Sequence, residues 1–144
     1  MDETTIREAI MDDVQELVRM NILFNGSSDS AEAMAARMTD PLRVETVIVA
    51  ENDGRVVGFA ALRIVACVLY PTPHAELTEL YVKEEYRQRG IGRQLVNYFE
   101  KQAMEKGAES LMVQTGLDNQ PALSLYRKMG FADYDITLQK SLNK

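Results

Sequence analysis

Residues 80–96 read LYVKEEYRQRGIGRQLV, and here an apolar run passes through a loop rich in glycine and arginine into a second apolar run. The first run, residues 80–82, is typical of a β-strand. The second continues as an amphipathic helix from 91 to about 106, with its apolar side chains on one face. Unpaired amides and the helix dipole favour an anion at such a helix start. The stretch therefore predicts either an anion-binding loop or a turn that uses glycine for geometry alone.

Two common phosphate-binding loops do not fit this stretch. A dinucleotide fingerprint needs a third glycine where Leu95 stands, together with an acidic residue at the end of the next strand. A P-loop needs Lys and Ser or Thr after its last glycine, whereas Arg93 and Gln94 follow Gly92. An anion at this loop must be bound in another way.

The remaining sequence predicts one α/β domain over residues 1–144. Two helices come first, over about 14–25 and 30–38, and Asp53-Gly54 then joins two apolar, β-branched runs as a hairpin. The other expected elements are strands over 75–82, 110–115 and 136–142, with helices over 91–106 and 119–129. The predicted order is α-α-β-β-β-α-β-α-β, which gives a mixed central sheet flanked by helices.

Composition narrows the class of protein. A single cysteine, Cys67, and a single histidine, His74, make a disulfide framework and a zinc site poor expectations, and a reducing cytoplasm is the expected compartment. A pI near 4.8 disfavours nucleic acid as a partner. The longest stretch without a charged residue, 64–75, is too short to span a membrane.

Charge is distributed unevenly along the chain. Residues 1–54 hold 12 acidic and 4 basic side chains, whereas residues 55–144 hold 10 acidic and 12 basic ones. The two parts either favour ligands of opposite sign or simply carry solvated charge.

Two motifs resemble those of a known family. Arg87-x-x-Gly90-x-Gly92 follows the strand of residues 80–82, and Asn119-x-x-Ala122-x-x-x-Tyr126-x-x-x-Gly130-Phe131 follows at the appropriate distance. Together they resemble the signatures of the GNAT superfamily of acetyl-CoA-dependent N-acetyltransferases. The resemblance covers essentially the whole chain and implies a GNAT-like single domain in which the central strands splay apart around acetyl-CoA.

The resemblance also implies a set of site residues. Backbone groups of the strand would pair with the pantetheine arm, the loop would hold the pyrophosphate, and Asn119 would hydrogen-bond the pantetheine. The residues expected to bind the cofactor are Leu80, Tyr81, Val82, Arg87, Gln88, Arg89, Gly90, Ile91, Gly92, Arg93, Asn119 and Tyr126. No metal is implied, and a homodimer is compatible with the family.

Three residues are candidates for proton transfer. An amine with a pKa of about 10 must lose a proton before it attacks a thioester, and Glu79, Glu76 or water alone can accept it. Glu76 and Glu79 face opposite sides of a regular strand unless a bulge intervenes. By resemblance Glu79 is preferred, acting through water, and Tyr126 protonates the departing thiolate; spacing alone would make Tyr126 a core residue.

The expected activity is acetyl transfer from acetyl-CoA to a primary amine of a cationic acceptor, either a small molecule or a basic peptide. A catalytically weak module that binds or senses acyl-CoA is the alternative. Cys67 is expected to be an inert thiol rather than an acyl carrier, because no activating partner is evident. His74 is expected to lie in a surface loop.

Overall fold

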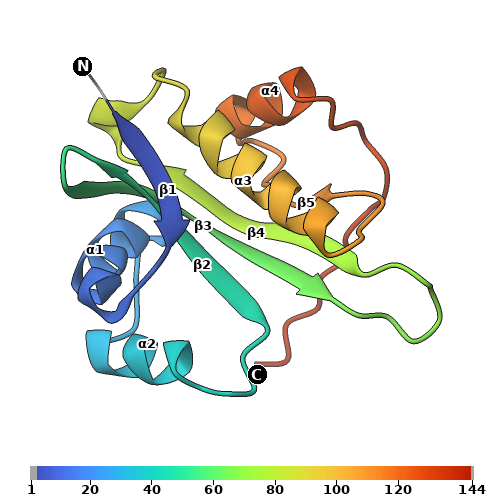
Figure 1. Cartoon of the computed structure of the whole chain (residues 1–144), viewed down its shortest axis with the longest axis horizontal. Coiled ribbons are helices and arrows are strands. Elements are labelled where there is room, and N and C mark those ends of the chain that lie inside the picture. Colours follow the sequence, from blue (N-terminus) through green and yellow to red (C-terminus); the bar gives the residue numbers. More distant parts are fainter. Residues whose placement is uncertain (1–2, 144) are drawn as a thin grey trace. The chain divides into compact units, whose positions relative to one another are not determined.

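The computed structural model describes residues 3–143 and divides the chain into two compact units, Met1–Gln114 and Thr115–Lys144. The first unit holds a five-stranded sheet in the order β1-β2-β3-β4-β5. The strands are β1 (Thr4–Glu8), β2 (Glu45–Asn52), β3 (Arg55–Val65), β4 (His74–Val82) and β5 (Met112–Val113). The first four pair antiparallel, whereas β5 runs parallel to β4 (Figure 1).

Helices of the first unit cover the two faces of this sheet. The first unit contains α1 (Val14–Asn25), α2 (Ala31–Met38) and α3 (Ile91–Glu105), and two short 3-10 helices, η1 (Met11–Asp13) and η2 (Glu84–Tyr86). The second unit contains α4 (Gln120–Lys128). The predicted class, a mixed α/β sheet flanked by helices, is confirmed.

The predicted element order is wrong at both ends of the chain. It omitted β1, whose sequence TTIRE is too short and polar to predict a strand on its own. It also placed a strand over residues 136–142, but no strand pairing is found there, and Ile136, Leu138 and Leu142 are exposed. A period-two pattern makes a strand only where a neighbouring strand completes the hydrogen-bond ladder.

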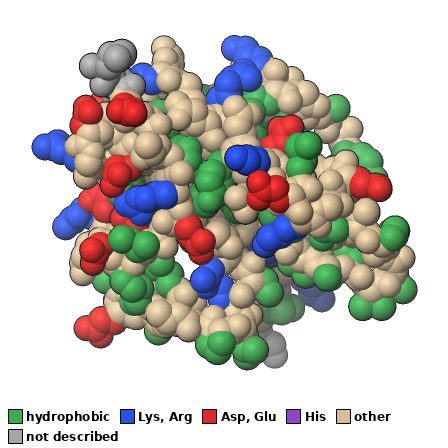
Figure 2. All heavy atoms as spheres, in the orientation of Figure 1, with side chains coloured by type: hydrophobic (Ala, Val, Ile, Leu, Met, Phe, Trp, Pro, Cys, Tyr) green, Lys and Arg blue, Asp and Glu red, His purple; other side chains and the backbone are tan. Residues whose placement is uncertain are grey.

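Charged side chains hold β1 in place. The Arg7 guanidinium donates two hydrogen bonds to Asp13, at 2.7 and 3.0 Å, and a third to Glu51 of β2 at 3.3 Å. Asp13 also accepts the amide of Ile10 at 2.8 Å, so one buried carboxylate joins β1 to the start of α1. Acidic and basic side chains are interspersed in the region of β1 and α1 in Figure 2.

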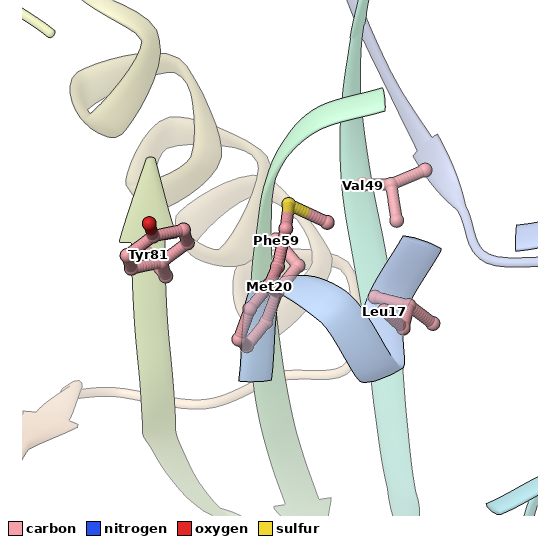
Figure 3. Close-up of a cluster of buried hydrophobic side chains, with 5 residues drawn as sticks. All are labelled: Leu17, Met20, Val49, Phe59 and Tyr81. Carbon is pink, nitrogen blue, oxygen red and sulfur yellow. The ribbon is translucent and has the colours of Figure 1, made fainter. Parts of the chain in front are cut away.

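An apolar cluster fixes α1 against one face of the sheet. Leu17 and Met20 of α1 pack with Val49, Phe59 and Tyr81, which come from three successive strands (Figure 3). The Phe59 and Tyr81 rings lie 5.8 Å apart between centroids. Two methionines of α2 pack against the same cluster, Met34 and Met38.

The helix α3 covers the opposite face. Its buried side chains Leu95, Val96 and Phe99 repeat at helical spacing, as the sequence predicts. Because neighbouring strand residues point to opposite sides, residues of β3 such as Leu62 face α3, whereas Phe59 faces α1. The sheet thus presents two different surfaces, and the residues of β4 are divided between them.

We expect Asp13→Asn to lower the free energy of unfolding by about 1–3 kcal/mol, because the buried charged hydrogen bonds of Arg7 are lost. The hydrogen bond from Arg7 holds the pKa of Asp13 below its usual range. The stabilisation is therefore complete above the unfolded-state pKa and disappears as the pH falls through the folded-state pKa. Urea unfolding at several pH values measures this, with the exposed neighbour Asp12→Asn as the control; equal stability of the two variants would contradict it.

Candidate functional site

A β-bulge interrupts the pairing of β3 with β4. Glu79 lies opposite Ala61, but Leu77 lies opposite Leu62, so Thr78 is an extra residue on β4. The Thr78 hydroxyl oxygen lies 3.2 Å from the Ala61 carbonyl oxygen, which is a second acceptor for its single proton beside the Glu45 carboxylate at 3.0 Å. A bulge shifts the alternation of side chains by one residue.

The bulge turns both candidate carboxylates to the same face. Glu76 lies opposite Arg63 and Glu79 opposite Ala61, two residues apart on β3, and residues two apart share a side of a strand. This is also the side of Phe59 and Tyr81, which carries α1 and α2. A regular strand would have separated the two carboxylates.

Glu79 is a partly buried carboxyl with raised proton affinity. Burial is the larger cause that raises its pKa, and the nearby Glu45 carboxylate is the second. Both effects disfavour the ionised form. A carboxyl of raised pKa is a stronger proton acceptor once ionised, which is a property required of a general base.

Glu76 lies in a more polar setting. It accepts a hydrogen bond from Gln114 Nε2 at 3.3 Å, and His74 Nε2 lies 3.9 Å from the same carboxylate oxygen. His74 is the first residue of β4, whereas the sequence suggested that it would lie in a surface loop. Cys67 lies after the end of β3, at intermediate exposure.

The far edge of β4 is left open beyond Leu77. β5 pairs only with Glu76 and Leu77, and no strand among residues 3–143 pairs with this edge of residues 78–82. The amide of Lys83 donates to the Val57 carbonyl at 2.8 Å, which directs its backbone toward β3. Since successive peptide groups alternate, Leu80 and Val82 present their backbone groups to the open edge. This is the expected splay.

Tyr81 differs from its two neighbours. Its backbone faces β3 and its side chain belongs to the apolar cluster under α1. The Arg87 guanidinium lies 5.5 Å from the centre of the Tyr81 ring, and Arg87 Nε donates to the Val82 carbonyl at 2.8 Å. Arg87 thereby ties the loop to the last residue of β4.

The loop after β4 is shaped as an open cradle at the start of α3. Gln88 and Gly90 have positive φ angles of 63° and 81°. A Cβ atom built on Gly90 would meet no heavy atom within 4 Å, so the backbone is exposed on that side. The first turn of α3 contains no acidic residue. Its leading amides have no intrahelical partner, which favours an anion.

Three further predicted loop residues, Ile91, Gly92 and Arg93, form the first turn of α3. The remaining arginine, Arg89, lies 5.0 Å from the centre of the Tyr86 ring. The binding roles of all these residues remain predictions.

The second unit contains the other predicted residues. Asn119 caps α4, because its side-chain oxygen accepts the amide of Ala122 at 3.4 Å. Tyr126 is 5% exposed, and its ring packs edge-on against Phe131 at 5.6 Å between centroids. The roles of Asn119 and Tyr126 toward a cofactor also remain predictions.

Sequence reasoning missed two residues near Glu79. Glu45 begins β2 and Arg63 lies beside it on β3, and the two form an ion pair at 3.4 Å. No sequence motif marks them, because they come together only through strand register. Within residues 3–143, no group of three His, Cys, Asp or Glu side chains could hold a metal ion, and no helix could cross a membrane.

Comparison with known proteins establishes the class. The profile of the Acetyltransferase (GNAT) family matches residues 11–131, and the chain belongs to this family. Its members transfer acetyl groups and use acetyl-CoA.

Relatives named for different acceptors resemble the chain. It is 28% identical over 132 residues to an IAA acetyltransferase of Azospirillum brasilense, covering 91% of this chain and 82% of the relative. It is 33% identical over 110 residues to a streptothricin acetyltransferase of Streptomyces lavendulae, covering 75% of this chain but only 53% of that protein. An N-alpha-acetyltransferase of Sulfurisphaera tokodaii is 28% identical over 141 residues, with 93% and 83% covered.

Solved structures share the fold. An aminoglycoside acetyltransferase from an uncultured soil metagenomic sample, in complex with sisomicin, superposes with a TM-score of 0.82 at 20% identity, covering 98% of this chain and 97% of that one. An aminoglycoside N-acetyltransferase in complex with CoA gives the same TM-score at 20% identity, covering 98% and 95%.

We expect Glu79→Gln to stabilise the protein relative to wild type when the pH is high enough to ionise Glu79. Because the folded-state pKa is raised, the wild type bears an ionisation penalty that grows as pH rises from the unfolded-state to the folded-state pKa. Below this window the two proteins should have similar stability. Urea unfolding across the window tests this, with Glu100→Gln on the exposed side of α3 as the control. A difference that does not vary with pH would contradict the assignment.

Proposed function

We propose that this chain transfers the acetyl group of acetyl-CoA to a primary amine of a cationic acceptor. The observation that carries the proposal is the bulge at Thr78, which sets a carboxyl of raised pKa, Glu79, on the stretch of β4 whose backbone edge is open. Base and cofactor edge are thus adjacent on one strand.

The residues of the first unit fit acetyl-CoA. The peptide groups of Leu80 and the amide of Val82, whose carbonyl is bound by Arg87, can pair with an extended amide chain such as pantetheine, as an added strand would. The cradle at Gly90 and the first turn of α3 can hold the pyrophosphate. When bound, acetyl-CoA supplies the thioester carbonyl that the amine attacks.

The chain's own contribution is to move protons. A cationic amine must give up a proton before its nitrogen lone pair can form the new C–N bond, and Glu79 accepts that proton through water. As the C–S bond breaks, the sulfur takes up a proton, for which Tyr126 is the proposed donor. Glu76, on the same face, is the second candidate for the base.

The proposed acceptor is defined only by its chemical class. Glu45, Glu76 and Glu79 lie on the sheet face that carries α1 and α2, so this face favours a positively charged group. The relatives' names specify different acceptors, among them streptothricin and an alanine of ribosomal protein bS18. These names support amine acetylation without selecting one substrate.

The deciding experiment measures CoA thiol release from acetyl-CoA over a panel of polyamines, aminoglycosides and basic peptides. We expect at least one cationic amine to stimulate release and to gain an acetyl group by mass spectrometry. In Glu79→Gln we expect lower turnover, most strongly at low pH, with partial recovery as the free amine accumulates. Tight CoA binding with no amine-stimulated release would favour a CoA-binding module instead.

We expect Gly90→Val to weaken CoA binding at least tenfold, about 1.4 kcal/mol. A Cβ would occupy the open side of the cradle, and a β-branched residue strains a backbone with φ of 81°. Gly107→Val is the matched control, because φ there is 87° and the residue follows the other end of α3. Calorimetry of folded variants gives both affinities, and an unchanged affinity in Gly90→Val would remove the pyrophosphate from this loop.

We expect Tyr126→Phe to lower turnover with little change in CoA affinity, because the ring and its packing on Phe131 are retained. A general acid acts in the transition state more than in the ground state. A positioned acid contributes about 10²–10⁴ in rate, and a thiolate leaves readily, so we expect the low end. Steady-state kinetics with a rate-limiting acetyl-transfer step tests this; wild-type turnover would make Tyr126 a core residue only.

A further inference from the structure

Glu45 is joined to the β4 bulge across the intervening strand. Its Oε2 accepts a hydrogen bond from Thr78 Oγ1 at 3.0 Å and lies 3.4 Å from Arg63 Nε. Glu45 is the first residue of β2, whereas Thr78 is the extra residue of β4. A side chain from one strand therefore holds the irregularity two strands away.

The strand register explains this reach. Glu45 lies opposite Arg63 on β3, and Arg63 lies opposite Glu76 on β4. The three side chains form a row on the face that carries α1 and α2. The bulge brings Thr78 beside this row, where its hydroxyl can meet the Glu45 carboxylate.

We propose that Glu45 is a positioning residue for Glu79: it anchors the bulge through Thr78, and its negative charge strengthens Glu79 as a proton acceptor. This inference rests on the proposed function, in which Glu79 is the base. The first effect fixes where the Glu79 carboxylate points, and the second fixes how strongly it holds a proton.

The electrostatics of this face support the second effect. Burial and the Glu45 charge both raise the pKa of Glu79. The other titratable or charged side chains on the face are Arg63 on β3, Glu76 and His74 on β4, and Arg7 of β1 with Glu51 of β2, which pair with each other. Arg63 offsets part of the negative charge of Glu45, to which it is bound.

Apart from the exposed Glu32 of α2, the charged side chains of the covering helices pair elsewhere. On α1, Glu16 binds Lys83 at 2.6 Å and Arg19 at 2.8 Å. On α2, Arg37 binds Asp29 at 3.0 Å. The Arg43 side chain, in the loop before β2, donates to the backbone carbonyls of Met38 and Glu45. Glu45 is thus the carboxylate whose charge, after burial, raises the pKa of Glu79.

The charge effect is tested by carbon-13 NMR titration of the Glu79 carboxyl in the free protein. In Glu45→Gln, which retains an oxygen to accept the Thr78 hydrogen bond, we expect Glu79 to titrate at lower pH than in wild type. Glu100→Gln, which removes one charge from an exposed position on α3, should leave the titration unchanged. Glu45→Met removes the same charge at similar volume and replaces the glutamine variant if that one does not fold. An unchanged Glu79 titration would overturn the charge effect.

The anchoring effect is tested by turnover. Thr78→Val removes the hydroxyl but keeps the β-branched shape, and we expect turnover with the best amine to fall about tenfold or more, as misplaced catalytic groups do. Thr78→Ser, which keeps the hydroxyl, should restore most of it. Wild-type turnover in Thr78→Val would overturn the anchoring effect. The titration needs no substrate, so it tests the charge effect even if the wild type has no activity. An inactive wild type would refute the proposed function and leave the result of the titration unaffected.

Discussion

The pairing of β3 with β4 is the constraint on which the candidate site depends, and it is irregular by one residue. Because Thr78 has no partner on β3, every side chain of β4 before it is turned relative to those after it. Glu76 and Glu79 consequently share a face, and Leu80 and Val82 direct their backbone to the open edge. Without the extra residue, Glu76 and Glu79 would lie on opposite faces of β4.

The strand β4 serves two purposes through different groups. Side chains such as Tyr81 anchor it in the apolar cluster, while peptide groups on its free edge remain available for hydrogen bonding. The loop that follows is fixed by Arg87, which binds the Val82 carbonyl and stacks on Tyr81. A rigid core therefore supports an exposed backbone, which suits an extended, amide-bearing ligand.

Local sequence patterns predicted several elements of the fold, including α3 and the loop before it. The helix of residues 91–105 follows from the spacing of its apolar residues, and the loop from Gly90 and its neighbours. The strand β1 could not be predicted, because Arg7 stabilises it through partners that are distant in sequence or outside the strand. The opposite failure occurred at 136–142, where an alternating pattern has no strand to pair with.

The candidate site was predicted in composition but not in arrangement. A spacing of three between Glu76 and Glu79 admits two geometries, and only the register at Thr78 distinguishes them. Glu45 carries no motif at all, since its meeting with Thr78 depends on two successive strand pairings. Long-range register is the information that local sequence patterns lack.

The position of β1 at the border of the sheet affects how readily two chains can associate. As the outer strand of the sheet within residues 3–143, it leaves one edge unpaired, and open edges invite hydrogen bonding by other polypeptides. Here the edge is only five residues long and carries Arg7 and Glu8 near its end. Short length and charge both discourage intermolecular strand addition, so this border of the sheet is protected against aggregation.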